Sequence, residues 1–371
     1  MHPVQTYTIL HLTGMDSTKY GGIERFNVAL SHQLSAMGYH SVFVYESMPV
    51  VSQYIEDLKK TSADIVVIKS RGNMLGFCKR FWQLLRQYNF CMMHAHFTKA
   101  RFYGIPLALL YGIKNIVYTI HSTASPVAEM KLHTRFWYAV FNKYCRIVAV
   151  SKDIEKVVHQ NWPTTLVQNI YLGINPINEG RTVAREKLGI ADDTLVVMCT
   201  ANFNHVKGLD ILTKAIAKLR DVKAIKNVVF YIVGQPDNDK AELQQLIKEL
   251  DVAAYIRLEG ISNRIPHYLS AADMYVQPSR NEGLPISLME ACSVGLPIVA
   301  SRVGGIPEVA IDGENAILFE AENVDACATA LRTMIFDEAM RKQYKEKSRK
   351  VYADKFQLSN NVNKLIDYYH L

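Results

Sequence analysis

The stretch 276–309, VQPSRNEGLPISLMEACSVGLPIVASRVGGIPEV, limits the possible folds of this chain more than any other segment. Apolar, strand-like runs alternate in it with two short helix starts, where Pro285 and Pro307 stand at positions that tolerate the loss of a backbone N–H. Gly295 is expected to end the first of these helices. Two helix N-termini at the ends of neighbouring strands offer unpaired N–H groups and a partial positive charge, which suit a phosphate or diphosphate.

Two glutamates stand in the same stretch, eight positions apart, at Glu282 and Glu290. Carboxylates beside a phosphate site need another partner, and sugar hydroxyls donate strong hydrogen bonds to them. The acid pair of a glycoside hydrolase is the alternative, and the spacing alone leaves it open. The surroundings, which suit a diphosphate, favour a nucleotide sugar and a transfer reaction.

Strand-like runs alternate with helical stretches along most of the chain, and this order predicts an α/β protein with parallel sheets covered by helices on both faces. At 371 residues the chain is too long for one ordinary core and suits two domains. We expect an N-terminal Rossmann-like domain over 1–175 and a C-terminal one over 176–356. The charged, loop-rich segment 172–195 is the expected linker, and a last helix over 357–371 is expected to pack back on the N-terminal domain.

Three loops carry further candidate site residues. Gly21 and Gly22 follow the first strand and precede a helix, which lets backbone approach a ligand. Lys207 follows a strand-end loop, where a lysine can neutralise a diphosphate. His121 ends the strand-like run YTIHS and is expected at the ligand-binding edge of its sheet. The plain alternatives are an ordinary Gly-Gly turn and a histidine that only packs.

We expect neither a bound metal nor disulfides. His94 and His96 form a spaced pair with no acidic or cysteine ligand near them in sequence, which argues against a metal site. Packing in the core is the favoured role for both, and contact with an acceptor substrate is the second. The acidic run at 237–239 is expected in a surface turn, where Asp and Asn are common. The six cysteines form no C-x-x-C pair, which indicates reduced thiols.

The positive charge of the chain is concentrated in its first half. Residues 1–175 carry 18 Lys and Arg against 9 Asp and Glu, whereas the remainder carries 24 against 26. A basic half indicates an anionic partner such as nucleic acid, a membrane surface or a phosphate-bearing substrate. The aromatic and basic run 72–89 suits a membrane with anionic lipids, or an ordinary amphipathic helix whose basic residues face water. The run 131–146 has the same character.

No apolar run reaches the length of about 18 residues that a membrane span needs. The chain enters a strand pattern at once, in TYTILHLT, so we expect no signal peptide. A cytoplasmic protein, peripheral at the inner face of the plasma membrane, is the resulting expectation.

Several motifs, in their order along the chain, resemble the retaining glycosyltransferases of family 4. The most specific match is SRNEGLPISLMEA followed by GLPIVASRVGGIPEV, which resembles the E-x7-E element and the Gly-rich loop of that family. Supporting pieces are GGIERF, VYTIHS, IVAVS, YLGIN and NHVKG. The resemblance runs along nearly the whole chain, is strongest over 196–356, and implies the GT-B architecture, in which two Rossmann-like domains face a central cleft.

The resemblance implies roles for the residues of the E-x7-E stretch. Glu282 would bind hydroxyls of the donor sugar. Gly283 and Leu284 would offer backbone N–H groups to the sugar and the phosphates. Glu290 would bind the ribose of the nucleotide.

The resemblance also implies roles outside this stretch. Lys207 would hold the diphosphate, His121 would contact the donor sugar, and Gly21 and Gly22 would lie beside the diphosphate. Asn202 is a departure, because the family commonly has arginine five positions before the lysine. Asparagine donates hydrogen bonds to a phosphate but brings no charge, so Lys207 and the helix N-termini would carry more of the stabilisation.

The implied activity is transfer of a sugar, with retention, from a nucleoside-diphosphate sugar to a glycan or lipid-linked acceptor in polysaccharide or surface-glycan biosynthesis. No metal cofactor and no nucleic-acid partner are expected. Two alternatives remain open at this point. One is a nucleotide-sugar epimerase on the same architecture, and the other is a non-catalytic sugar-binding subunit, which Asn202 keeps in consideration.

Overall fold

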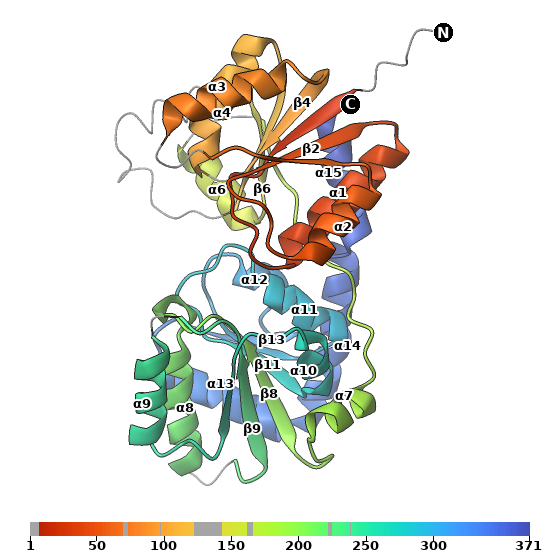
Figure 1. The fold of residues 1–371 in the computed structure, drawn as a ribbon. Helices are drawn as coiled ribbons and strands as arrows, with labels where there is room; N and C mark the ends of the chain where they lie inside the picture. The colour runs from red at the N-terminus through yellow and green to blue at the C-terminus, as the bar shows by residue number, and fades with distance from the viewer. Residues whose placement is uncertain are drawn as a thin grey trace. The chain divides into compact units, whose positions relative to one another are not determined.

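The computed structural model describes residues 7–69, 73–96, 98–121, 143–161, 166–221, 225–237 and 239–371. The chain divides into two compact units (Figure 1). The first unit comprises the chain up to Ile174 together with Leu358–Leu371, and the second comprises Asn175–Gln357.

In the first unit the described residues form a seven-stranded parallel sheet in the order β3-β2-β1-β4-β5-β6-β7. Its strands are β1 (Thr8–Leu12), β2 (His40–Tyr45), β3 (Asp64–Val67), β4 (Phe90–Ala95), β5 (Asn115–Ile120), β6 (Arg146–Ala149) and β7 (Val167–Asn169). Its helices are α1 (Gly22–Ala36), α2 (Ser52–Lys60), α3 (Met74–Leu85), α4 (Thr98–Tyr111), α6 (Lys152–Asn161) and α15 (Leu358–Tyr369). The strand order reverses between β1 and β4, which makes that position a topological switch point.

The second unit repeats this plan with a six-stranded parallel sheet in the order β10-β9-β8-β11-β12-β13. Its strands are β8 (Leu195–Thr200), β9 (Val228–Val233), β10 (Ile256–Glu259), β11 (Met274–Gln277), β12 (Ile298–Ser301) and β13 (Ala316–Phe319). Its helices are α7 (Arg181–Leu188), the short 3-10 helix η2 (His205–Lys207), α8 (Leu209–Asp221), α9 (Lys240–Glu249), α10 (Ile265–Ala271), α11 (Ile286–Val294), α12 (Ile306–Val309), α13 (Val324–Phe336) and α14 (Glu338–Lys355). The switch point lies between β8 and β11.

The helices of the second unit form two groups, one with α8, α9 and α13 and the other with α7, α10, α11 and α14 (Figure 1). The central strands between them are apolar, and β11 and β12 are buried along their whole length. Both units are therefore α/β layers with parallel sheets, which confirms the predicted fold class.

The last helix of the chain, α15, belongs to the core of the first unit. Its residues Leu358, Val362 and Leu365 are buried in one cluster with Ile9 of β1 and Phe26 of α1. The chain thus returns to the unit in which it began.

The segment 172–195, expected to be a loop-rich linker, contains a helix that was not foreseen, α7 at residues 181–188. Arg185 explains this helix, since it is only 2% exposed and makes an ion pair with Asp273 at 2.8 Å. Its guanidinium also donates to the backbone carbonyls of Ala271 and Thr194. A charged residue that looks solvent-facing in sequence therefore anchors α7 to the sheet.

The run 72–89 forms a shorter helix than its pattern predicts, α3, with Asn73 as its N-cap. Phe77 and Phe81 are buried and stacked with ring centroids 5.3 Å apart, whereas Lys79 and Arg86 are exposed. Among the described residues, no helix is both long and apolar enough to cross a membrane. Most of the run 131–146 lies outside the described residues.

Candidate functional site

The switch point of the second sheet brings Lys207 and Glu282 together. Lys207 ends the short helix η2 that follows β8, and Glu282 lies in the loop that follows β11. Because β8 and β11 are neighbouring parallel strands, both loops lie at the same edge of the sheet. The Lys207 Nζ is 2.6 Å from Glu282 Oε1. Ligands of doubly wound folds bind at this kind of position.

The Glu282 carboxylate is fixed by two further donors. Gln277 Nε2 donates to its Oε1 at 2.7 Å, and Ser279 Oγ donates to the same atom at 2.9 Å. Ser287 Oγ in turn donates to Gln277 Oε1 at 3.1 Å, which orients the amide. The Glu282 side chain is 11% exposed and that of Lys207 26%, so the pair is partly shielded from water. Glu282 is thus an oriented carboxylate within reach of a ligand.

Close backbone contacts hold the loop that carries Glu282. Gly304 has a φ of +49°, and a Cβ there would stand 1.9 Å from the Glu282 carbonyl oxygen. The N–H of Gly305 donates to the carbonyl of Gly283 at 2.9 Å. Leu284 is buried and leads into α11, which begins at Ile286 after the N-cap residue Pro285. The first N–H groups of a helix have no partner within the helix, and α11 begins four residues after Glu282.

The predicted helix end at Gly295 is confirmed, because this residue is the C-cap of α11 with a left-handed φ of +83°. Glu290 lies within α11 and is half-buried, and its carbonyl accepts a hydrogen bond from Ser293 Oγ. Asn202 lies in the loop after β8 with its side chain exposed, and its carbonyl accepts from the N–H of Asn204.

Arg280 is a site-forming residue that the sequence analysis missed. Its guanidinium makes a bidentate pair with Asp210 at 2.8 and 3.0 Å, and it also pairs with Glu322. The Arg280 guanidinium also donates to the carbonyl of His205, and the backbone N–H of Arg280 donates to the carbonyl of Val206. These bonds tie η2, and with it Lys207, to the end of β11. Asp210 and Glu322 lie far from Arg280 in sequence, so no local pattern could reveal them.

The other predicted site residues, Gly21, Gly22 and His121, belong to the first unit. Gly21 directly precedes α1, which begins at Gly22, and its N–H donates to the Glu24 carboxylate at 3.0 Å. Ser17 Oγ donates to the other Glu24 oxygen at 3.0 Å. The loop after β1 is therefore folded onto the first turn of α1.

His121 follows β5 and joins a cluster of imidazoles. Its Nε2 is 3.0 Å from Nδ1 of His96. His94 is buried between Thr119, whose Oγ1 is 2.7 Å from His94 Nε2, and Tyr369, whose hydroxyl is 2.6 Å from His94 Nδ1. Burial lowers the pKa of His121 to about 4, so this imidazole is neutral at neutral pH. It would contact a ligand as a neutral hydrogen-bonding group.

Comparison with known proteins places the chain in a family. The family described as "Glycosyl transferases group 1" matches residues 180–351, and "Glycosyltransferase Family 4" matches residues 20–177. The chain belongs to these glycosyltransferases. The two matches adjoin near the boundary between the two units and together cover most of the chain.

Solved structures share the fold over nearly the whole length. A glycosyltransferase from Rickettsia africae has a TM-score of 0.84 at 18% identity, with 98% of both chains covered. Anabaena HepE, in complex with UDP and glucose, has a TM-score of 0.81 at 20% identity, with 97% of this chain and 98% of that chain covered. The fold of this chain is therefore GT-B, as its resemblance to family 4 implied.

Curated relatives match over shorter spans. The D-inositol 3-phosphate glycosyltransferase of Streptomyces avermitilis is 26% identical over 70% of this chain, and the chain covers 59% of that relative's length. The GDP-mannose-dependent alpha-(1-6)-phosphatidylinositol monomannoside mannosyltransferase of Mycolicibacterium smegmatis is 30% identical over 47% of this chain and 48% of its own length.

Proposed function

We propose that the protein transfers a glycosyl unit from a nucleoside-diphosphate sugar to an acceptor hydroxyl, with retention of the anomeric configuration. The Lys207–Glu282 pair at the switch point of the second sheet carries this proposal. It sets a cation and an oriented carboxylate side by side at 2.6 Å, next to the first turn of α11. A diphosphate and a sugar hydroxyl are the ligands that this combination suits. The UDP-glucose complex of Anabaena HepE and the GDP-mannose dependence of the mycobacterial relative support a nucleotide-sugar donor.

Each predicted site residue of the second unit then has a role. Lys207 exchanges its contact with Glu282 for the diphosphate and stabilises the charge that develops on it as the sugar leaves. Glu282 binds sugar hydroxyls, and Glu290 binds the ribose. The N–H groups of Gly283 and Leu284 bind the sugar and the phosphates.

Three further points of the proposal concern Asn202, the proton of the acceptor hydroxyl and the need for a metal. Asn202 adds a hydrogen bond to the diphosphate but no charge, so the reaction depends strongly on Lys207. We assign no general base, because the leaving phosphate itself takes the proton of the acceptor hydroxyl. Lys207 supplies the cation that a metal would otherwise provide, so we propose that transfer needs no metal and that EDTA leaves it unchanged.

The role of the site is tested with Lys207→Ala and Glu282→Ala. We expect each variant to lose transfer by roughly 100-fold or more, because each removes a contact to the group on which charge develops. Lys248→Ala removes a cation from the exposed face of α9 and should behave as wild type. A panel of nucleotide sugars, screened first by thermal shift, identifies the donor, since a bound donor raises the melting temperature. Unchanged turnover in both site variants would exclude this site.

A second measurement distinguishes transfer from epimerisation. The donor is incubated with the protein in the absence of acceptor, and the sugar is then analysed. Donor that stays intact until an acceptor is added agrees with transfer. Epimerised donor would instead assign the protein to the isomerases of the same architecture.

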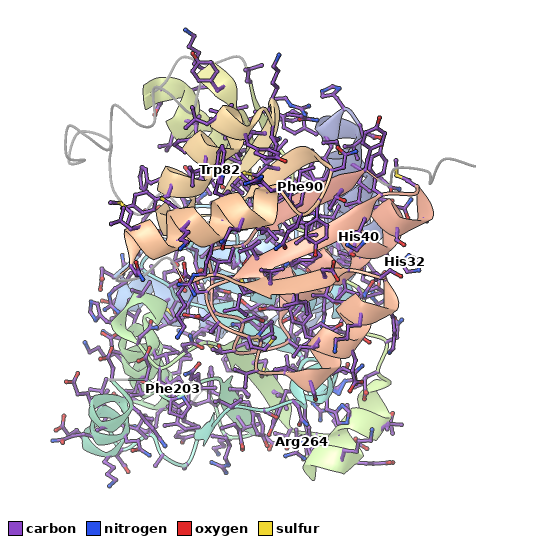
Figure 2. The ribbon with its side chains drawn as sticks, turned by 45° about the horizontal axis from the view of Figure 1, so that its top comes forward. His32, His40, Trp82, Phe90, Phe203 and Arg264 are labelled. Carbon is purple, nitrogen blue, oxygen red and sulfur yellow. The ribbon has the colours of Figure 1, made fainter. Side chains whose placement is uncertain are left out.

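We also propose that the acceptor is a lipid-linked glycan of a polysaccharide or surface-glycan pathway, and that the first unit contacts an anionic membrane from the cytoplasmic side. Trp82 lies on α3 (Figure 2). It is 37% exposed, and its ring contacts that of Tyr111 at a centroid distance of 5.7 Å. Leu110, which precedes Tyr111 in the sequence, is 78% exposed. The basic Lys79 of α3 and Arg86 at its C-cap are also exposed. Aromatic and basic side chains on one surface suit an interface with anionic lipid headgroups.

This contact is tested with liposomes at low salt. Liposomes with anionic lipid should retain the protein, and Trp82→Ser should weaken retention several-fold. Val50→Ser removes an apolar side chain that is 72% exposed, more than Trp82, elsewhere in the first unit and serves as the control. Equal retention on neutral liposomes would contradict a role for charge.

A further inference from the structure

A cavity lies in the second unit, away from Lys207 and Glu282. Its volume is about 650 Å³, which is within the size range of small-molecule sites. Its walls include Asp273, directly before β11, and Pro297, directly before β12. The cavity therefore lies at the amino ends of these strands, whereas Lys207 and Glu282 follow the carboxyl ends of β8 and β11. The two places are at opposite edges of one sheet.

Helix α14 forms a charged wall of this cavity. Its lining residues recur at three- and four-residue intervals, which places them on one face of the helix. They are Glu338, Arg341, Lys342, Lys345 and Arg349. The remaining walls come from the segment before α7, the end of α10 and the turn after α11.

Each acidic side chain that lines the cavity already has a basic partner. The pairs are Asp273 with Arg185 at 2.8 Å, Glu179 with His267 at 3.0 Å, and Glu338 with Lys342 at 2.6 Å. These acids are therefore not available to neutralise the other cations of α14.

Three cations of α14 remain without an acid inside the cavity. Arg341 donates to backbone carbonyls at the end of α13, and Arg349 pairs with Glu346, which does not line the cavity. In the part of the chain that the structure describes, Lys345 has no ion pair within 4 Å. Arg341, Lys345 and Arg349 are spaced by four residues, which corresponds to about 6 Å along the helix. This repeat suits a ligand with successive anionic groups.

Ser270 at the end of α10 gives an independent indication of a ligand. The residue is 8% exposed and lines the cavity. Its Oγ is buried and has no hydrogen-bond partner among the described residues. Buried hydroxyls nearly always have a partner, and this one would gain it if the Ser270 side chain turned towards an acceptor atom on a bound molecule.

We propose that this cavity binds a small molecule with at least two phosphate-type groups, held by Arg341, Lys345 and Arg349 and by a hydrogen bond from Ser270. A purely structural role explains only part of the charge. Arg349 lies over the C-cap of α11, since a Cβ on Gly295 would stand 2.8 Å from its Nε, and a cation there stabilises the negative end of that helix. Arg341 has a similar role, because it donates to the carbonyls of Met334 and Ile335 at the end of α13. Neither role supplies an acid for Lys345 or a partner for the Ser270 hydroxyl.

The site is tested by titration calorimetry at constant ionic strength with inorganic phosphate, pyrophosphate and tripolyphosphate. All measurements use the full chain with Lys207→Ala, which weakens the proposed diphosphate site at the opposite edge of the sheet. We expect binding to strengthen from phosphate to tripolyphosphate. Adding Lys345→Gln should weaken tripolyphosphate about tenfold, and adding Ser270→Ala should weaken it several-fold.

Lys347→Gln is the matched control, because it makes the same charge change on α14 at an exposed position that does not line the cavity. It should bind as the Lys207→Ala parent does. Equal weakening by Lys345→Gln and Lys347→Gln would mean diffuse attraction to a basic helix, and no binding of tripolyphosphate would leave the cations a structural role only. Either result overturns the proposal. The test involves no glycosyl transfer, so it stands apart from the proposed function.

Discussion

At the scale of single residues, four histidines of the first unit lie where the protein keeps their imidazoles uncharged. His11 stacks on Phe43 with ring centroids 4.3 Å apart, and neither of its ring nitrogens has a hydrogen-bond partner among the described residues. Burial lowers the pKa of His11 to about 3 and that of His121 to about 4, and it lowers the pKa values of His94 and His96 well below the ordinary value. All four are neutral in the folded protein at neutral pH.

A loss of stability in acid follows from these pKa values. Below about pH 6.5 the unfolded chain protonates its histidines while the folded first unit does not, so the free energy of unfolding falls as the pH drops towards the folded values near 4 and 3. His11→Leu removes one such proton and should make this fall less steep, by up to about 1.4 kcal/mol per pH unit. Urea denaturation at several pH values measures it. His32→Gln, exposed on α1 (Figure 2), should follow wild type. Identical slopes for His11→Leu and wild type would contradict the account.

Residue identity in sequence was enough to nominate Lys207 and Glu282 as site residues, because each stands at a strand end before a helix. The structure brings these two together, and their catalytic roles stay predictions. The residues that orient them were not foreseen. Gln277 reads in sequence as a strand residue, and its bond to Glu282 depends on how the chain turns after β11. Arg280 depends on partners from two distant elements.

At the scale of elements, the loop between β8 and α8 must approach the end of β11 closely to present Lys207. Gly208 makes this possible. Its φ is +64°, and a Cβ there would stand 2.0 Å from the carbonyl oxygen of Pro278. Any side chain at this position would push η2 away from the Glu282 loop.

Gly208→Ala should therefore reduce both stability and activity. We expect a loss of about 1–3 kcal/mol in the free energy of unfolding from the strained backbone, and a fall in kcat/KM of at least tenfold because Lys207 is displaced. Thermal denaturation measures the loss of stability, and initial rates at varied donor concentration measure kcat/KM. Gly180→Ala is the control, since its Cβ would meet no atom within 4 Å and its φ is −73°. Equal behaviour of the two variants would show that the close approach is unimportant.

The order of strands and helices was largely predictable, because apolar runs of strand length alternate along the chain with amphipathic runs of helical period. Helix α7 was missed because its sequence, RTVAREKL, is mostly charged. The burial of Arg185 depends on the acceptors that Asp273 and the loop 191–194 provide, and these are invisible in a local window.

At the scale of the whole molecule, the chain passes between the two units twice, after Ile174 and before Leu358. The final helix α15 supplies buried side chains to the core of the first unit. Arg146 and Asn115 also bind carbonyls at the end of this helix, as in the bond from Asn115 Nδ2 to the Tyr369 carbonyl at 2.9 Å. The stability of the first unit therefore depends on the last residues of the chain.

Leu365→Ala tests this dependence. Leu365 is 3% exposed, so truncation leaves a cavity and should lower the stability of the first unit by about 2–5 kcal/mol. Hydrogen exchange read by mass spectrometry separates the units: amides of β1 and β4 should exchange faster, while those of β8 and β11 keep their wild-type protection. Lys364→Ala, on the exposed side of the same helix, should change neither. If both sheets lost protection equally, α15 would stabilise the two units as one cooperative body. The expected dependence of the first unit alone on this helix would then be wrong.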